Sequence, residues 1–274
     1  MPEWLFIFIN GASVEIGAGI WNTSMKLIAG IVSTPPQDFS RGTWVFVRDT
    51  LYPWSIGIGL SILNLFFIIG FLKAVSNLHQ NITLEMVMET LVKIVVANVL
   101  FLNILNIMTI IFKIASAMAK EVFLLKVPEL KANDMDLGSA LFYALFGFLF
   151  VLVAIVCSFL MIWTVYSRYI KLYVLVVLAP FAMGTIVGGQ ESERTFYAWI
   201  RTFLLNTFEI VVIALTMVIS FKLIGAGVSL FDGKTIVTSV VDGFWDVLNS
   251  LFTMILVTAA VKGANTFLAK AMGL

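Results

Sequence analysis

Two groups of polar side chains recur at helical spacing within otherwise apolar stretches of this sequence. In the first group, Asn98, Asn106, Thr109 and Lys113 fall within about a quarter turn of one helix face. Polar residues in an apolar helix either hold neighbouring helices together through hydrogen bonds or line a water-filled path. Both interpretations of this stripe remain open at the level of sequence.

The second group adds a carboxylate. Asn206, Glu209 and Thr216 share one helical face, and Glu209 is the acidic residue that lies well inside an apolar segment. At membrane depth a carboxylate needs a proton, a basic partner such as Lys113 or Arg168, or contact with water. Glu209 therefore either fixes helix register as a buried pair or lines or gates an aqueous path. Wild-type activity in a Glu209→Leu variant would contradict the second interpretation.

Residues for enzymatic chemistry are scarce. The chain has one histidine, His79, and one cysteine, Cys157, so neither a His/Cys metal site nor a Cys–His catalytic pair is indicated. No phosphate-binding loop with a Gly-x-x-x-x-Gly-Lys-Ser/Thr pattern occurs. We expect a protein that is not an enzyme and that uses no cofactor and no metal.

The composition points to a membrane. Hydrophobic residues make up 61% of the 274 residues and charged residues 12%, whereas soluble domains average about 45–50% and about 25%. Mean hydropathy is +1.04, and several apolar stretches approach the roughly 20 residues that cross a bilayer core. The net charge of +1 favours no charged partner over the whole surface. We expect an all-α, polytopic helical membrane protein in the cell membrane.

The sequence predicts that the chain has three parts. Residues 1–32 predict an amphipathic helix, which either lies in the membrane interface or crosses the bilayer. Residues 33–53 predict a linker, because Pro35 and Pro36 end any helix. The membrane domain, 54–274, is expected to contain six spans: 54–72, 91–114, 141–165, 169–187, 202–223 and 244–261.

The fourth of these spans ends in an unusual way. In "LAPFAMGTIVGGQESERTFYAWI", residues 178–200, Pro180 is expected to kink the helix, and Gly188 and Gly189 to let the chain turn. Trp199 is typical of a residue that anchors the next span at the membrane interface. Lys and Arg are more numerous in the loops on this side, which favours a cytoplasmic position for the turn.

That order of features resembles a known family. The segment "RYIKLYVLVVLAPFAMGTIVGGQESERTFYAWIRTFL", 168–204, resembles the signature region of TrbL-type polytopic channel subunits of type IV secretion and conjugation systems. Pro180, Arg194 and Trp199 match its positions. Residues 70–115 and the tail "AAVKGANTFLAKAMG" look like the version in conjugative elements of Gram-positive bacteria. Longer members carry a large extracytoplasmic region that has no counterpart here.

The resemblance implies an integral channel or scaffold subunit that helps DNA–protein substrates cross the cytoplasmic membrane. Its expected partners are other secretion-channel subunits, a cytoplasmic ATPase and the lipid bilayer. The charged loop of Glu191, Glu193 and Arg194 is the expected contact for the ATPase. A homo-oligomer is expected, because six or seven helices cannot enclose a wide pore. The alternative is a secondary transporter or transporter membrane subunit, which polar stripes and a broken helix also fit.

Overall fold

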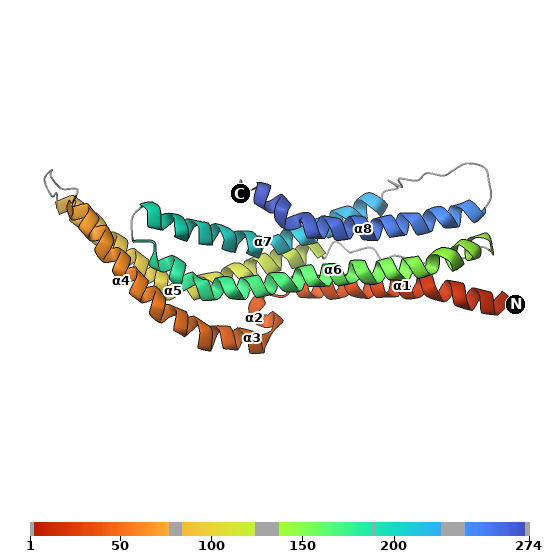
Figure 1. The fold of residues 1–274 in the computed structure, drawn as a ribbon, viewed down its shortest axis with the longest axis horizontal. Coiled ribbons are helices and arrows are strands. Elements are labelled where there is room, and N and C mark those ends of the chain that lie inside the picture. The colour runs from red at the N-terminus through yellow and green to blue at the C-terminus, as the bar shows by residue number, and fades with distance from the viewer. Residues whose placement is uncertain (1–2, 77–83, 124–136, 188–189, 226–238, 272–274) are drawn as a thin grey trace. The chain divides into compact units, whose positions relative to one another are not determined.

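The computed structural model describes residues 3–76, 84–123, 137–187, 190–225 and 239–271, which are almost entirely helical and include no strand (Figure 1). The elements follow one another along the chain as α1 Glu3–Val32, α2 Pro36–Phe39, α3 Arg41–Phe46, the π-helical turn η1 Val47–Leu51, α4 Tyr52–Ser76, α5 Leu84–Phe123, α6 Leu137–Gly184, α7 Gln190–Gly225 and α8 Ser239–Ala271.

Within the described residues, five stretches are long and apolar enough to cross a membrane. They are Arg41–Ile69, Ile94–Phe123, Phe146–Gly184, Ser192–Ser220 and Leu248–Ala271. The chain is therefore an all-helical protein with the features of a multi-pass membrane protein. Whether α1, which is not among the five, lies in the interface or crosses the bilayer stays a prediction.

The expected division into six spans differs from the structure between the third and fourth spans. The predicted third and fourth spans, 141–165 and 169–187, form one helix, α6, of 48 residues. No glycine or proline occurs between Gly147 and Pro180, so nothing in the main chain interrupts the helix. At about 1.5 Å per residue α6 is about 70 Å long, more than twice the roughly 30 Å hydrocarbon core.

The predicted linker is also more helical than expected. Pro35 is extended, with φ −69° and ψ 153°, and Pro36 opens α2. Proline is well tolerated at the first helical position because the N–H it lacks would have no partner there. From Arg41 the chain is helical through α3 and η1 into α4, so the candidate span starts at residue 41 instead of 54.

The chain packs as two compact units, each built from separate stretches of sequence. The first unit contains 1–33, 116–167 and 209–274, and the second contains 34–115 and 168–208. The boundaries predicted at residues 32 and 53 stay predictions.

In the first unit, each of α1, α6 and α8 buries one face. On α1 that face recurs every three or four residues, as in an amphipathic helix, and consists of Val14, Ala18, Trp21, Met25, Ile28 and Val32. The charged Glu15 and Lys26 of α1 are exposed. Met161 of α6 and Val257 of α8 are fully buried in the same unit.

In the second unit, two tyrosines of α6 hold the segment that contains the prolines. Tyr169 donates its hydroxyl to the carbonyl of Thr34 at 2.7 Å, and Tyr173 donates to the carbonyl of Pro36 at 2.8 Å. The ring of Phe39 stacks on Tyr169 with centroids 4.0 Å apart. These contacts fix the chain where it leaves α1.

A row of aromatic rings joins α3, α5 and α7 within the second unit. Trp44 meets Phe112 edge-on at 6.5 Å, Phe112 lies 5.4 Å from Phe203, and Phe203 stacks on Trp199 at 5.5 Å. Aromatic pairs at such separations add about 0.5–1.5 kcal/mol each beyond the area they bury. This row holds α5 against α7.

Candidate functional site: polar groups at membrane depth

The polar stripe on α5 faces outward. Asn98, Asn106 and Lys113 are exposed and Thr109 is half-buried, all inside the candidate span Ile94–Phe123. The opposite face of the helix is the one packed against protein, through Ala97, Phe101, Ile104, Met108 and Phe112. The asparagines therefore do not join α5 to other helices of the described structure.

Two polar side chains of this stripe each make one bond to their own helix. Asn98 donates to the carbonyl of Ile94 at 3.1 Å, and Thr109 donates to the carbonyl of Asn106 at 2.7 Å. A side-chain amide has two N–H donors and an acceptor oxygen. One bond leaves Asn98 able to bond water or another protein.

The polar stripe on α7 turns inward instead. Asn206 and Glu209 are 8% and 4% exposed, and Thr216 is half-buried. Asn206 donates to the carbonyl of Thr202 at 2.8 Å. Two stripes of similar composition thus have opposite environments.

Glu209 has a hydrogen-bond donor on α8. Its Oε2 accepts from Nδ2 of Asn265 at 3.0 Å, within the first unit. A buried carboxylate is costly unless hydrogen bonds or charges compensate it. Asn265 was not predicted as a site residue. An amide side chain within the apolar stretch 251–268 could have indicated it, as the amide within an apolar stretch did for Asn206. A basic partner for Glu209, Lys113 or Arg168, stays a prediction.

Arg168 is buried in the middle of α6, with 1% of its surface exposed. Its Nε donates to the carbonyl of Asn206 at 2.7 Å, and its Nη2 donates to the carbonyl of Thr207 at 3.3 Å. The guanidinium carbon lies 5.4 Å from the centre of the Tyr169 ring. The two carbonyls of α7 and the Tyr169 ring compensate the buried positive charge. Arg168 can therefore lie inside a continuous helix.

Pro180 lies inside α6, which continues to Gly184. Proline leaves the carbonyl four residues earlier without its helical partner, and the kink expected from this stays a prediction. After Gly184 the chain turns, with Thr185 N–H donating to Ala182 at 3.1 Å. Gly188 and Gly189, expected to form the turn, lie outside the described residues.

Trp199 is buried inside the second unit, and its expected role as an anchor at the membrane interface stays a prediction. It is 7% exposed, donates Nε1 to the carbonyl of Leu175 at 3.1 Å and stacks on Phe203. The neighbouring Tyr197 is 61% exposed. The hydrogen bond of the indole to Leu175 therefore joins α7 to α6 inside the second unit, and the stack on Phe203 packs the ring against α7.

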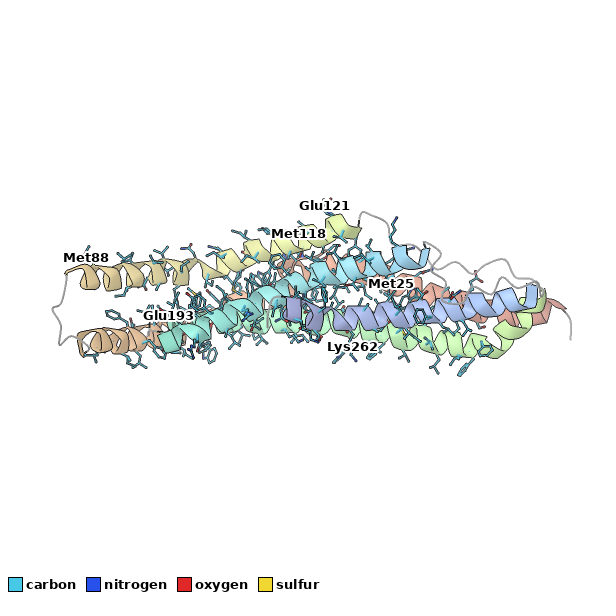
Figure 2. All side chains as sticks on the ribbon, turned by 90° about the horizontal axis from the view of Figure 1, so that it is seen from above. Met25, Met88, Met118, Glu121, Glu193 and Lys262 are labelled. Carbon is cyan, nitrogen blue, oxygen red and sulfur yellow. The ribbon has the colours of Figure 1, made fainter. Side chains whose placement is uncertain are left out.

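The predicted charged loop is the start of a helix. Glu191 and Glu193 belong to the first turn of α7, which begins at Gln190, and Arg194 follows directly. Acidic residues suit this position because the helix dipole is positive there. Glu193, which Figure 2 labels on α7, is half-buried, and Arg194 is exposed. The contact expected for an ATPase stays a prediction, and it would lie at the start of α7.

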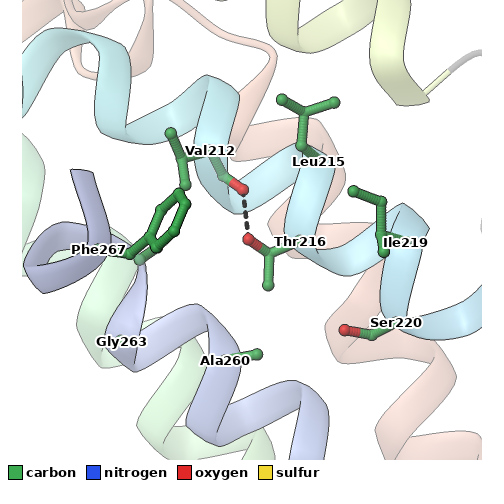
Figure 3. A pocket seen from close by; sticks show the side chains of 9 residues that line it. Val212, Leu215, Thr216, Ile219, Ser220, Ala260, Gly263 and Phe267 are labelled. Atoms are coloured by element: carbon green, nitrogen blue, oxygen red, sulfur yellow. Dashed lines mark hydrogen bonds between the residues drawn. The ribbon is translucent and has the colours of Figure 1, made fainter. Parts of the chain in front are cut away.

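A groove of about 520 Å³ lies between α7 and α8 in the first unit (Figure 3). It begins one turn beyond Glu209, and its lining is Val212, Leu215, Thr216, Ile219, Ser220, Ala260, Gly263, Ala264 and Phe267. Phe267 lies beside Val212 at one end, and Ile219 and Ser220 mark the other (Figure 3).

Two further findings bear on identity. In the described part of the chain, no three His, Cys, Asp or Glu residues gather closely enough to hold a metal ion. No family model, curated protein or solved structure matches the chain. Function is therefore argued from the placement of the polar groups and the groove.

Proposed function

We propose that this chain is an integral channel or scaffold subunit of a type IV secretion machine for conjugative DNA transfer. The observation that supports this is the uncovered polar face of α5. A basic side chain at the bilayer centre costs about 2.5–3.5 kcal/mol, and Lys113 shares an exposed face with Asn98 and Asn106. A second protein or a water-filled lumen at this face would remove that cost, and a subunit of a larger assembly has both.

We choose a type IV secretion machine because residues 168–204 resemble TrbL-type subunits. In this proposal, copies of the chain and other channel subunits surround a water-filled lumen that the polar face of α5 lines, and the bilayer surrounds the remaining apolar faces. A cytoplasmic ATPase contacts the start of α7, at Glu191, Glu193 and Arg194. DNA–protein substrate passes transiently.

A secondary transporter or transporter subunit is the second candidate. The buried Glu209–Asn265 pair favours it, because carboxylates inside a helical bundle often mark ion pathways. The two candidates differ in where water reaches the protein, which is the outer face of α5 in the first and the inner face of α7 in the second.

Thiol accessibility in cells tests the proposal. In a Cys157→Ser background, Asn98→Cys and Asn106→Cys should react with a hydrophilic thiol reagent when the machine is assembled. Val96→Cys and Ile114→Cys are matched controls, because both side chains are 50% exposed on the same helix, about a third of a turn from the stripe. Equal inertness of all four would contradict a water-filled lumen at the α5 face and would reject the proposal.

Transfer assays test the choice of machine separately. Conjugation frequency should fall in a deletion strain and recover with the wild-type gene. Reversal of the charges at Glu191, Glu193 and Arg194 should impair transfer while the protein remains folded. Unchanged transfer after deletion would reject the conjugative role, and reactive cysteines at 98 and 106 would then identify a different membrane assembly.

A further inference from the structure

The groove between α7 and α8 has high apolar walls and a floor of small residues. Leu215 and Ile219 on α7 are 42% and 61% exposed, and Phe267 on α8 is 67% exposed. Ala264, on the floor, is buried. The lining belongs to the candidate spans Ser192–Ser220 and Leu248–Ala271. The groove therefore opens at membrane depth.

The lining of the groove is almost entirely apolar. No charged side chain lines the groove, and Thr216 and Ser220 are its two polar residues. The Thr216 hydroxyl donates to the carbonyl of Val212 at 2.6 Å, as the dashed line in Figure 3 shows. Because a water molecule needs about two to four polar partners to be held in a cavity, an ordered cluster of water would find too few here.

The floor leaves backbone uncovered. A Cβ atom built on Gly263 would meet no other atom within 4 Å. Because Gly263 carries no side chain, the groove stays open down to the main chain of α8. Glycine is typical of positions where a ligand approaches the main chain.

The size of the groove also indicates an occupant. Ligand pockets range over about 300–1,000 Å³, and the groove is about 520 Å³. An apolar cavity of about 150 Å³ already holds a benzene molecule. A space several times larger is more than a local packing defect.

We propose that the groove binds one acyl chain of a membrane phospholipid, which stays with the protein as bound lipid. Acyl chains are the apolar molecules that surround the protein at this depth, and their flexibility lets them fill an irregular slot. A helix from a second copy fits less well, because it would meet the exposed Ile219 and Phe267 before it reached the floor. This inference does not depend on the proposed role in secretion.

Lipid retention by the full-length protein in detergent tests the inference. Phospholipid per chain is measured by intact-protein mass spectrometry and by extraction. Gly263→Leu places a side chain in the groove and should lower retained lipid about tenfold, equivalent to about 1.4 kcal/mol. Gly57→Leu is the matched control, because a Cβ on that α4 glycine also meets no atom within 4 Å. It should retain the wild-type amount.

Two further measurements keep the test decisive. A phospholipid with a diazirine in one acyl chain should label peptides that contain Leu215 or Phe267. Phe267→Ala, which removes one wall and adds no bulk, should weaken both labelling and retention even if Gly263→Leu folds poorly. Equal lipid in Gly263→Leu, Gly57→Leu and wild type would overturn the inference. Unchanged lipid with a smaller oligomer in Gly263→Leu would identify a second copy as the occupant and overturn it too.

Discussion

The main chain of Gly59 in α4 lies directly against Pro180 in α6, within the second unit. A Cβ atom at position 59 would fall 2.6 Å from the Pro180 carbonyl oxygen, and one at Gly184 would fall 2.8 Å from the carbonyl oxygen of Gly59. Small residues on both helices thus permit a close approach that larger ones would block. The proline is part of this helix contact.

The Gly59–Pro180 contact predicts a position-specific effect of one methyl group. Gly59→Ala should lower the free energy of unfolding by about 1–3 kcal/mol, because backbone atoms of α6 cannot move aside easily. Gly57→Ala, two residues away with open space around its Cβ, should be neutral or stabilising by up to about 1 kcal/mol. Thermal unfolding of both variants in one detergent measures the difference, and equal midpoints would contradict the contact.

A substitution between arginine and lysine should lower stability at one position of α6 and leave it unchanged at a nearby position. Arg168→Lys loses the fork that reaches the Asn206 and Thr207 carbonyls and should cost about 1.5–3 kcal/mol for each bond lost. Lys171→Arg, at an exposed position three residues later, should leave the unfolding midpoint unchanged. A stable Arg168→Lys protein would show that the buried guanidinium geometry does not matter.

The Glu209–Asn265 bond predicts energetic coupling between α7 and α8. Asn265→Leu removes the donor to the buried carboxylate and should cost about 1–3 kcal/mol. Glu209→Gln should be better tolerated in the Asn265→Leu background than in wild type, since a neutral amide is cheaper to bury than a carboxylate. A double-mutant cycle on unfolding free energies measures the coupling. Strictly additive effects would show that the two side chains do not act together.

Trp199 should contribute both as a hydrogen-bond donor and as a packed ring. Trp199→Phe loses the bond to Leu175 and should cost about 0.5–1.5 kcal/mol. Trp199→Ala also loses the stack on Phe203 and should cost about 3–5 kcal/mol. Tyr197→Phe, at an exposed ring, is the control and should be neutral. Equal midpoints for Phe and Ala at 199 would argue against the aromatic row.

Helix content and membrane character could be predicted because they depend on local properties. Length and hydropathy of each apolar stretch led to an all-α membrane protein, as the five candidate spans show. The break expected between the predicted spans 141–165 and 169–187 is not present, because α6 continues through residues 166–168. Arg168 instead finds carbonyls on α7 that lie 38 and 39 residues away in sequence, which no local pattern reveals.

The two polar stripes show where sequence stops and tertiary structure begins. Helical spacing alone placed Asn98 with Asn106, and Asn206 with Glu209, because the period of a helix is local geometry. Which of these faces is covered depends on the neighbours that each helix acquires. Packing leaves the α5 stripe exposed and buries the α7 stripe. The Asn265 partner and the groove over Gly263 exist only because α8 lies against α7, so they were decided by tertiary structure.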